Sequence, residues 1–116
     1  MTQKAVVWWI MLHHVLLAKL KSDLPDDAVE ELMVESRIRL LKIPEVMNLR
    51  CGKRLDPKKT PYEFFLAMDV ENTAKLRVIY ESAIYLQFKQ QVLDAKTFEI
   101  SEMSFEMEPG KDVSYS

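Results

Sequence analysis

The chain has 116 residues, of which 48% are hydrophobic and 29% are charged, and its formal net charge is -2. This length suits one domain with one core and leaves no room for two domains of ordinary size. The charge balance lacks the basic excess of typical nucleic-acid binders, and the single cysteine, Cys51, excludes an internal disulfide and a cysteine-based metal cluster.

We expect a single domain over residues 1–116, with a core at about 11–107, an extension of the first strand at 1–10 and a loose tail at 108–116. The apolar run near the start meets two histidines without a small-residue cleavage pattern, so it does not resemble a secretory signal. Even extended to Leu20, this run is too short to cross a bilayer as a helix. We therefore expect a cytoplasmic protein that binds neither membrane nor nucleic acid and uses no cofactor or metal.

The stretch from Val6 to Leu20 predicts the first strand, because it is rich in β-branched and aromatic residues. Successive side chains of a strand point to opposite faces. One face then carries His14, Leu16, Ala18 and Leu20, and the other carries His13, Val15, Leu17 and Lys19. Because one layer of helices covers only one face, the second apolar face needs another subunit or another layer.

The first helix is expected from the capping and acidic residues of Ser22–Asp27 to about Lys42. Its apolar positions recur near helical spacing around the small Ser36, and they are Val29, Leu32, Met33, Leu40 and Leu41. Pro44 ends this helix, and Val46–Arg50 predicts a short second strand.

A polar loop with two prolines follows at 52–61, and Tyr62–Val70 predicts the third strand by its period-two alternation. Helix-forming residues from Asn72 to Ala95 predict one helix that Ser82 breaks and caps again. The last strand is expected at Phe98–Met107.

The predicted order is strand, helix, strand, strand, helix, strand, which is the ferredoxin-like α+β arrangement with helices on one face of an antiparallel sheet. The other face of this sheet stays open. Its apolar side chains predict that two copies pack face to face as a two-fold homodimer. The neighbouring Trp8 and Trp9 are expected to pack at the same interface.

Four segments carry a resemblance to a known family. His14-Val15-Leu16-Leu17-Ala18-Lys19-Leu20-Lys21 resembles its opening strand, and Ile43-Pro44-Glu45-Val46 with the later Gly52 resembles its Ile-Pro-Gly-Val motif and glycine. Tyr62–Val70 resembles the third strand, and Ser82-Ala83-Ile84-Tyr85-Leu86-Gln87-Phe88 lies where the family often has His-Pro-Ala-His-x-x-Phe. In this order and spacing, Met11–Met107 is similar to the stress-responsive A/B barrel family, also called Dabb.

This resemblance implies a ferredoxin-like fold whose two copies join their sheets into a dimeric α/β barrel. The family includes plant stress-associated proteins, bacterial proteins without a known activity and a polyketide cyclase that works in an apolar pocket between sheet and helices. His14 matches a pocket histidine of the cyclase, and Tyr85 stands at the position of its catalytic histidine. Ile79 and Phe64 stand at the positions of its tyrosine and of another pocket histidine.

Carried over residue by residue, His14 and Tyr85 are the candidate catalytic residues. The candidate ligand pocket is lined by Leu16, Ala18, Leu32, Met33, Ser36, Phe64 and Leu66. Two readings stay open for it: the small side chains leave an open cavity, or the large ones fill the space. His14 likewise is either a hydrogen-bonded core group or a ligand contact that titrates near neutral pH.

His13 should point to the opposite face, near Glu63, Asp69 or a symmetry mate. Adjacent histidines on a strand diverge, so His13 and His14 cannot hold one metal ion together. We therefore expect no metal site.

Two classes of function follow from these residues. The first is a dimeric protein without a catalytic constellation, either structural or holding a small apolar or aromatic ligand, and linked to stress by the resemblance. The second is an enzyme on a small aromatic or polyketide-like substrate, a cyclase, lyase or cofactor-free monooxygenase, with His14 as acid or base and Tyr85 as hydrogen-bond donor. Fold alone does not separate them, because this architecture serves many functions.

Overall fold

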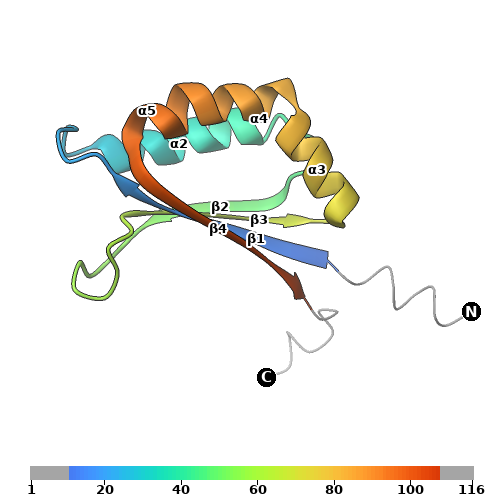
Figure 1. Ribbon diagram of the computed structural model, residues 1–116, viewed down its shortest axis with the longest axis horizontal. Helices are drawn as coiled ribbons and strands as arrows, with labels where there is room; N and C mark the ends of the chain where they lie inside the picture. Colours follow the sequence, from blue (N-terminus) through green and yellow to red (C-terminus); the bar gives the residue numbers. More distant parts are fainter. Residues whose placement is uncertain (1–10, 108–116) are drawn as a thin grey trace, which may run out of the picture.

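A computed structural model describes residues 11–107 of the chain as a four-stranded sheet with helices against one of its faces (Figure 1). The strands and helices follow one another in the expected order of a split β-α-β fold. Their bounds are β1 Met11–Leu20, α2 Ala28–Leu40, β2 Met47–Lys53, β3 Phe64–Val70, α3 Thr73–Glu81, α4 Ala83–Phe88, the π-helical turn η1 Lys89–Leu93, α5 Asp94–Lys96 and β4 Thr97–Met107. The expectations for residues 1–10, including Trp8 and Trp9, and for 108–116 lie outside the described residues.

The sheet has the strand order β2-β3-β1-β4, and each neighbouring pair is antiparallel. On the central strand β1, His14 pairs with Met68 of β3 on one side and with Ser104 of β4 on the other. The chain crosses between non-adjacent strands through α2 and through the α3–α5 segment, which both lie on the same side of the sheet (Figure 1). The predicted ferredoxin-like α+β fold is confirmed.

The first helix differs from its prediction at both ends. The segment Ser22–Asp27 forms turns, in which the Ala28 amide donates to the Pro25 carbonyl at 3.1 Å, and α2 begins only at Ala28. Leu41 was expected on the buried face and is 62% exposed, so that expectation is wrong. The helix ends at Leu40, which is fully buried, and the next side chain projects about 100° further around the axis into solvent.

The second and third strands also shift by a few residues. β2 extends to Lys53 and so includes Cys51, whereas β3 starts at Phe64, two residues later than expected. The β2–β3 pairing is irregular between Met47 and Arg50, where Asn48 adopts a left-handed backbone with φ of 49°. Asparagine tolerates this conformation better than most side chains, so the sequence suits the irregularity.

The prediction that Ser82 breaks and caps the second helical segment is confirmed. The Ser82 hydroxyl donates to the Ile79 carbonyl at 2.8 Å and accepts from the Tyr85 amide at 3.1 Å. Its extended backbone separates α3 from α4, so one side chain ends the first helix and begins the next. This bend directs Tyr80 of α3 and Tyr85 of α4 toward the same part of the sheet.

The core lies between the sheet and the helices. His14, Leu16 and Ala18 of β1 are buried against the helices, while His13, Val15 and Leu17 on the other face are only partly buried, as the alternation predicted. The open face also carries Phe65 of β3 and Phe105 of β4, which are 37% and 54% exposed. Among the described residues, no helix is long and apolar enough to span a membrane.

Leu32 tests how tightly this core is packed. Leu32→Ala should lower the free energy of unfolding by about 2–5 kcal/mol, because Leu32 is fully buried and its truncation leaves a cavity. Leu55→Ala is the matched control, since Leu55 is 99% exposed and its truncation should change the stability by less than about 0.5 kcal/mol. Urea denaturation followed by circular dichroism measures both values, and equal values would show that Leu32 is not a core residue.

Candidate functional site

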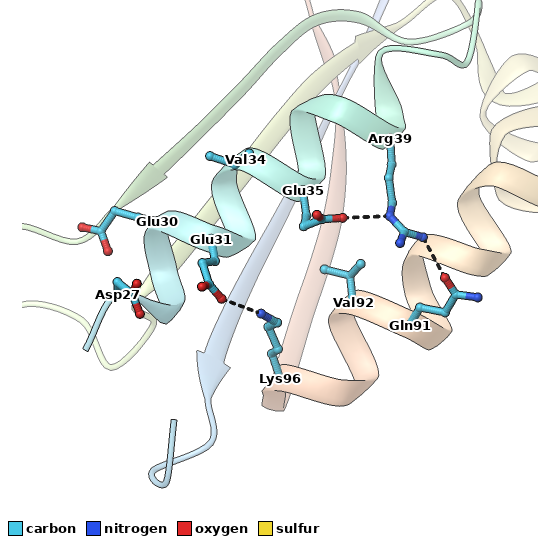
Figure 2. Close-up of a pocket in the computed structure, with 9 residues that line it drawn as sticks. All are labelled: Asp27, Glu30, Glu31, Val34, Glu35, Arg39, Gln91, Val92 and Lys96. Carbon is cyan, nitrogen blue, oxygen red and sulfur yellow. Dashed lines mark hydrogen bonds and ion pairs between the residues drawn. The ribbon is translucent and has the colours of Figure 1, made fainter. Parts of the chain in front are cut away.

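The residues predicted to line a ligand pocket belong to the hydrophobic core. Six of the seven are buried, and Met33 is partly buried against them. Ser36 satisfies its hydroxyl within α2 by donating to the Leu32 carbonyl at 2.7 Å. These side chains pack between the sheet and the helices, and a pocket of about 590 Å³ lies elsewhere, between α2 and η1 (Figure 2).

His14 is the buried centre of a polar cluster at the edge of this core. Its side chain is 3% exposed, and both ring nitrogens have partners. Nδ1 lies 2.7 Å from the Ser104 hydroxyl, and Nε2 lies 3.0 Å from a Glu102 carboxylate oxygen and 2.9 Å from the Tyr80 hydroxyl. The strand register explains the contacts to β4, because Ser104 pairs with His14 and Glu102 lies two residues further along the same face.

Glu102 contacts both His14 and Tyr85, the two candidate catalytic residues predicted from the sequence. One of its carboxylate oxygens accepts hydrogen bonds from the hydroxyls of Tyr80 and Tyr85, each at 3.3 Å, in addition to its contact with His14. The hydrogen bond from His14 holds the pKa of Glu102 below its ordinary value, against the opposing effect of partial burial. Glu102 is therefore an ionised carboxylate at neutral pH, and its side chain remains 31% exposed.

The two tyrosines are strong candidates for hydrogen-bond donors and weak candidates for bases. Burial, and then the negative charge of Glu102, raises the pKa of both Tyr80 and Tyr85 well above the ordinary value. Their rings lie 5.1 Å apart between centroids, and the Tyr80 ring meets His14 edge-on at 5.7 Å. Both hydroxyls therefore stay protonated across the neutral range.

The cluster around His14 contains the groups that are needed to transfer a proton to or from a molecule bound beside it. Imidazole is the side chain that most often serves as general acid or base, and here a carboxylate contacts it directly. Phenol hydroxyls can hold a carbonyl or hydroxyl oxygen by donating to it. Since His14 is buried and Glu102 is partly exposed on the edge strand β4, a small molecule would approach from the β4 side.

Sequence reasoning found two of the five cluster residues and missed Tyr80, Glu102 and Ser104. The alternation of β4 places Glu102 and Ser104 on one face, and this signal is present in the sequence. The pairing register that brings this face beside His14 is not visible in the sequence. Tyr85 and His14 meet through the Glu102 carboxylate.

His13 lies on the open face, as predicted, and its partner is Asp69 rather than Glu63. His13 Nδ1 lies 2.9 Å from one Asp69 carboxylate oxygen, and the Asn48 side-chain amide donates to the other at 2.8 Å. Burial acts to raise the pKa of Asp69, but the hydrogen bonds from Asn48 and His13 outweigh it and lower the pKa. Within residues 11–107, no group of three or more His, Cys, Asp or Glu side chains is placed to hold a metal ion.

Comparison with known proteins identifies the fold. A dabb family protein with a ferredoxin-like fold from Mesorhizobium loti superposes with a TM-score of 0.73 at 17% identity, over 83% of this chain and 95% of that one. A dimeric ferredoxin-like protein of unknown function from Thermobifida fusca gives 0.74 at 16% identity, over 84% and 92%. The hydroxynitrile lyase from Passiflora edulis gives 0.73 at 15% identity, over 84% and 94%.

No family model matches the sequence, and no curated protein matches it. The fold of the chain is therefore the ferredoxin-like fold of a dabb family protein, which agrees with the resemblance found in the sequence. At these identities the same fold is shared by a lyase and by a protein of unknown function, so function rests on the site.

Glu102 should contribute stability that depends on pH. A folded-state pKa below the unfolded value of about 4.3 gives stabilisation that is present above that pH and is lost as the pH falls through the folded pKa. Glu102→Gln should therefore lower the unfolding free energy by about 1 kcal/mol at pH 7 and leave it nearly unchanged at pH 3. Urea denaturation at both pH values measures the difference.

Glu106→Gln is the matched control on the same strand, because no hydrogen bond to its side chain is found among the described residues. It should change the stability little at either pH. A Glu102→Gln variant with the same loss at pH 3 as at pH 7 would contradict the ionised cluster.

Proposed function

We propose that the protein is a homodimeric member of the stress-responsive A/B barrel group, in which two copies cover each other's open sheet face. The observation that carries this proposal is the apolar character of that face. Its side chains include Val15, Leu17, Phe65, Met103 and Phe105, and the helices of the same chain lie on the opposite side (Figure 1). The dimeric state named for the Thermobifida fusca protein of the same fold supports it.

The role of such a dimer, in this proposal, is structural or partner-binding rather than the storage of a ligand inside each protomer. The buried residues between sheet and helices support this role, because they pack against one another where the ligand pocket was expected. A cytoplasmic location belongs to the same proposal. The free, half-buried Cys51 fits a reducing compartment, where disulfides are rare.

Phe105→Glu tests the dimer. A carboxylate at this exposed position of the open face would lose its hydration on association, and its cross-strand neighbour His13 already pairs with Asp69, so the variant should be monomeric. Leu86→Glu is the control, because Leu86 is 47% exposed on α4 in the helix layer and should leave the dimer intact. Light scattering coupled to size exclusion measures the masses, and a monomeric wild-type chain at micromolar concentration would refute the proposal.

A second candidate function is acid–base catalysis at the cluster of His14, Tyr80, Tyr85, Glu102 and Ser104. The contact of a buried imidazole with an ionised carboxylate and protonated phenols favours it. In this reading His14 transfers the proton, Glu102 orients its ring, and Tyr85 or Tyr80 donates to an oxygen of a small aromatic substrate. The hydroxynitrile lyase of the same fold points to a lyase on small hydroxynitriles as the first class to test, ahead of a cyclase or a cofactor-free monooxygenase.

His14→Gln separates the two candidate functions. If the cluster is catalytic, this change should lower kcat at least about 100-fold on an aromatic hydroxynitrile, because the proton acceptor is lost. His13→Gln is the matched control, since His13 lies next in the chain but on the opposite face, and it should keep the rate. Release of the aromatic aldehyde, followed by absorbance, gives both rates, and equal rates for the two variants would exclude His14 as the catalytic residue.

A further inference from the structure

The outer face of α2 carries an apolar stripe that the rest of residues 11–107 leaves exposed. Val34, Ile38 and Leu41 are 44%, 54% and 62% exposed. Their spacing of four and then three residues places them on one side of the helix. The residues that α2 buries against the sheet, Ala28, Leu32, Ser36 and Leu40, lie on its opposite side. The helix therefore has two apolar faces, and a helix of this kind is normally covered on both.

The sheet-face dimer, in which two copies pack their open sheet faces together, would leave this stripe in solvent. In Figure 1, α2 lies in the helix layer, so its outer side points away from the sheet. Two copies that join through their sheets keep their helix layers on the outside of the assembly. The stripe therefore needs a separate partner.

The charges beside the stripe change sign along the helix. Glu31 and Glu35 lie on one flank toward its beginning, and Lys42 follows on the same flank just after its end. No ion pair of Lys42 is found within the described part of the chain. Both glutamates pair inside the domain yet keep side chains that are 57% and 41% exposed, so their outer oxygens remain accessible.

Contacts across the neighbouring pocket hold these glutamates in place (Figure 2). The Lys96 ammonium lies 3.2 Å from the Glu31 carboxylate, and the Arg39 guanidinium bridges Glu35 and the Gln91 amide oxygen at 3.0 Å each. These bridges tie α2 to η1 and α5. The acidic side chains are therefore preorganised beside the stripe, which lowers the cost of ordering them when they bind.

A second copy of α2 in antiparallel orientation would complement this face. If a two-fold axis passes beside Ile38, the apolar stripe meets itself, with Val34 near Leu41 of the other copy. At about 1.5 Å per residue, Lys42 lies about 6 Å from the axis, whereas Glu35 and Glu31 lie about 4.5 Å and 10.5 Å on the other side of it. The two-fold operation then brings Lys42 of one copy between Glu31 and Glu35 of the other.

We propose that the outer face of α2 is a second self-association surface, through which two copies of this chain pack their α2 helices antiparallel about Ile38. On the flank of Glu31, Glu35 and Lys42, the order of charges favours a second copy over an unrelated helix, because one isologous contact pairs both copies of Lys42 at once. The pairing of α2 helices stands independently of the proposed function. Larger assemblies, in which this contact links sheet-face dimers, rest on the proposed function.

Ile38→Glu tests the stripe. Sedimentation velocity from micromolar to millimolar concentration should show wild-type species larger than the sheet-face dimer, whereas Ile38→Glu should remain a dimer. Val78→Glu is the matched control, because Val78 is 45% exposed on α3, away from the stripe, and should assemble as the wild type does. Identical sedimentation of the wild type and Ile38→Glu up to millimolar concentration would overturn the proposal.

Charge exchange tests the antiparallel register. Lys42→Glu should weaken assembly at least about 10-fold, because its carboxylate would meet those of Glu31 and Glu35. The double variant Glu35→Lys with Lys42→Glu should restore part of this loss, since Glu31 still faces the new carboxylate. Glu35→Lys alone controls for the loss of the pair with Arg39. Assembly should also weaken as salt is raised. A double variant that assembles no better than Lys42→Glu would overturn the register.

A cross-linking experiment separates this surface from the sheet-face dimer. In a Cys51→Ser background, oxidation should join two chains through Ile38→Cys and should not do so through Val78→Cys. With Phe105→Glu added, the α2 contact should still link chains in pairs. Loss of the Ile38→Cys cross-link with an intact sheet-face dimer overturns the α2 contact alone. A chain with Phe105 unchanged that is monomeric at micromolar concentration and still cross-links through Ile38→Cys overturns the sheet-face dimer alone.

Discussion

Burial of both faces of β1 is the constraint on which the rest of the architecture depends. This strand lies between β3 and β4 and has apolar side chains on each side of the sheet. The helices cover the face of Leu16 and Ala18 completely, which leaves Val15 and Leu17 on a face that the described part of the chain covers only partly. The hydrophobic effect that assembles the domain therefore also favours association through this face.

The same constraint explains the polar cluster beside the core. A histidine on the buried face of β1 needs partners for both ring nitrogens, because an unsatisfied buried polar atom costs about 1–3 kcal/mol. Edge strand β4 supplies Ser104 and Glu102, and the bend at Ser82 supplies the tyrosines. Glu102 keeps part of its hydration at the edge, so it remains charged without the full cost of burying a carboxylate. The need to satisfy buried polar atoms accounts for such a network by itself. The rates of the His14→Gln and His13→Gln variants distinguish a structural network from a catalytic site.

Local patterns predicted the parts of the structure that local chemistry determines. Alternation placed His13 and His14 on opposite faces, and the capping residue Ser82 predicted the break between α3 and α4. The start of α2 was missed because Ser22–Asp27 offers several capping residues, but this segment forms turns, and the N-cap Asp27 makes no side-chain capping bond. Glu102 and Ser104 were missed because they depend on the register between strands about 90 residues apart, which periodicity does not encode. Tyr80 was missed because its contact with His14 depends on how α3 packs on the sheet. The outer stripe of α2 was missed for a related reason, since two opposed apolar faces on one helix blur its periodicity.

The two apolar surfaces that residues 11–107 leave exposed differ in what they require of a partner. The sheet face is broad and apolar, so it can drive association by burial, with the pair of His13 and Asp69 as a polar element within it. The α2 stripe consists of three side chains, too few to hold two chains together strongly, and its flanking charges add only modest, salt-sensitive energy. A dimer presents two such stripes, however, and where the assembly closes on itself the second contact forms at high effective concentration. Two isologous interfaces on one chain close into a ring or tetramer only when their axes intersect at a suitable angle, and otherwise they produce an open filament. The weakness of the α2 contact is then what keeps the larger assembly reversible.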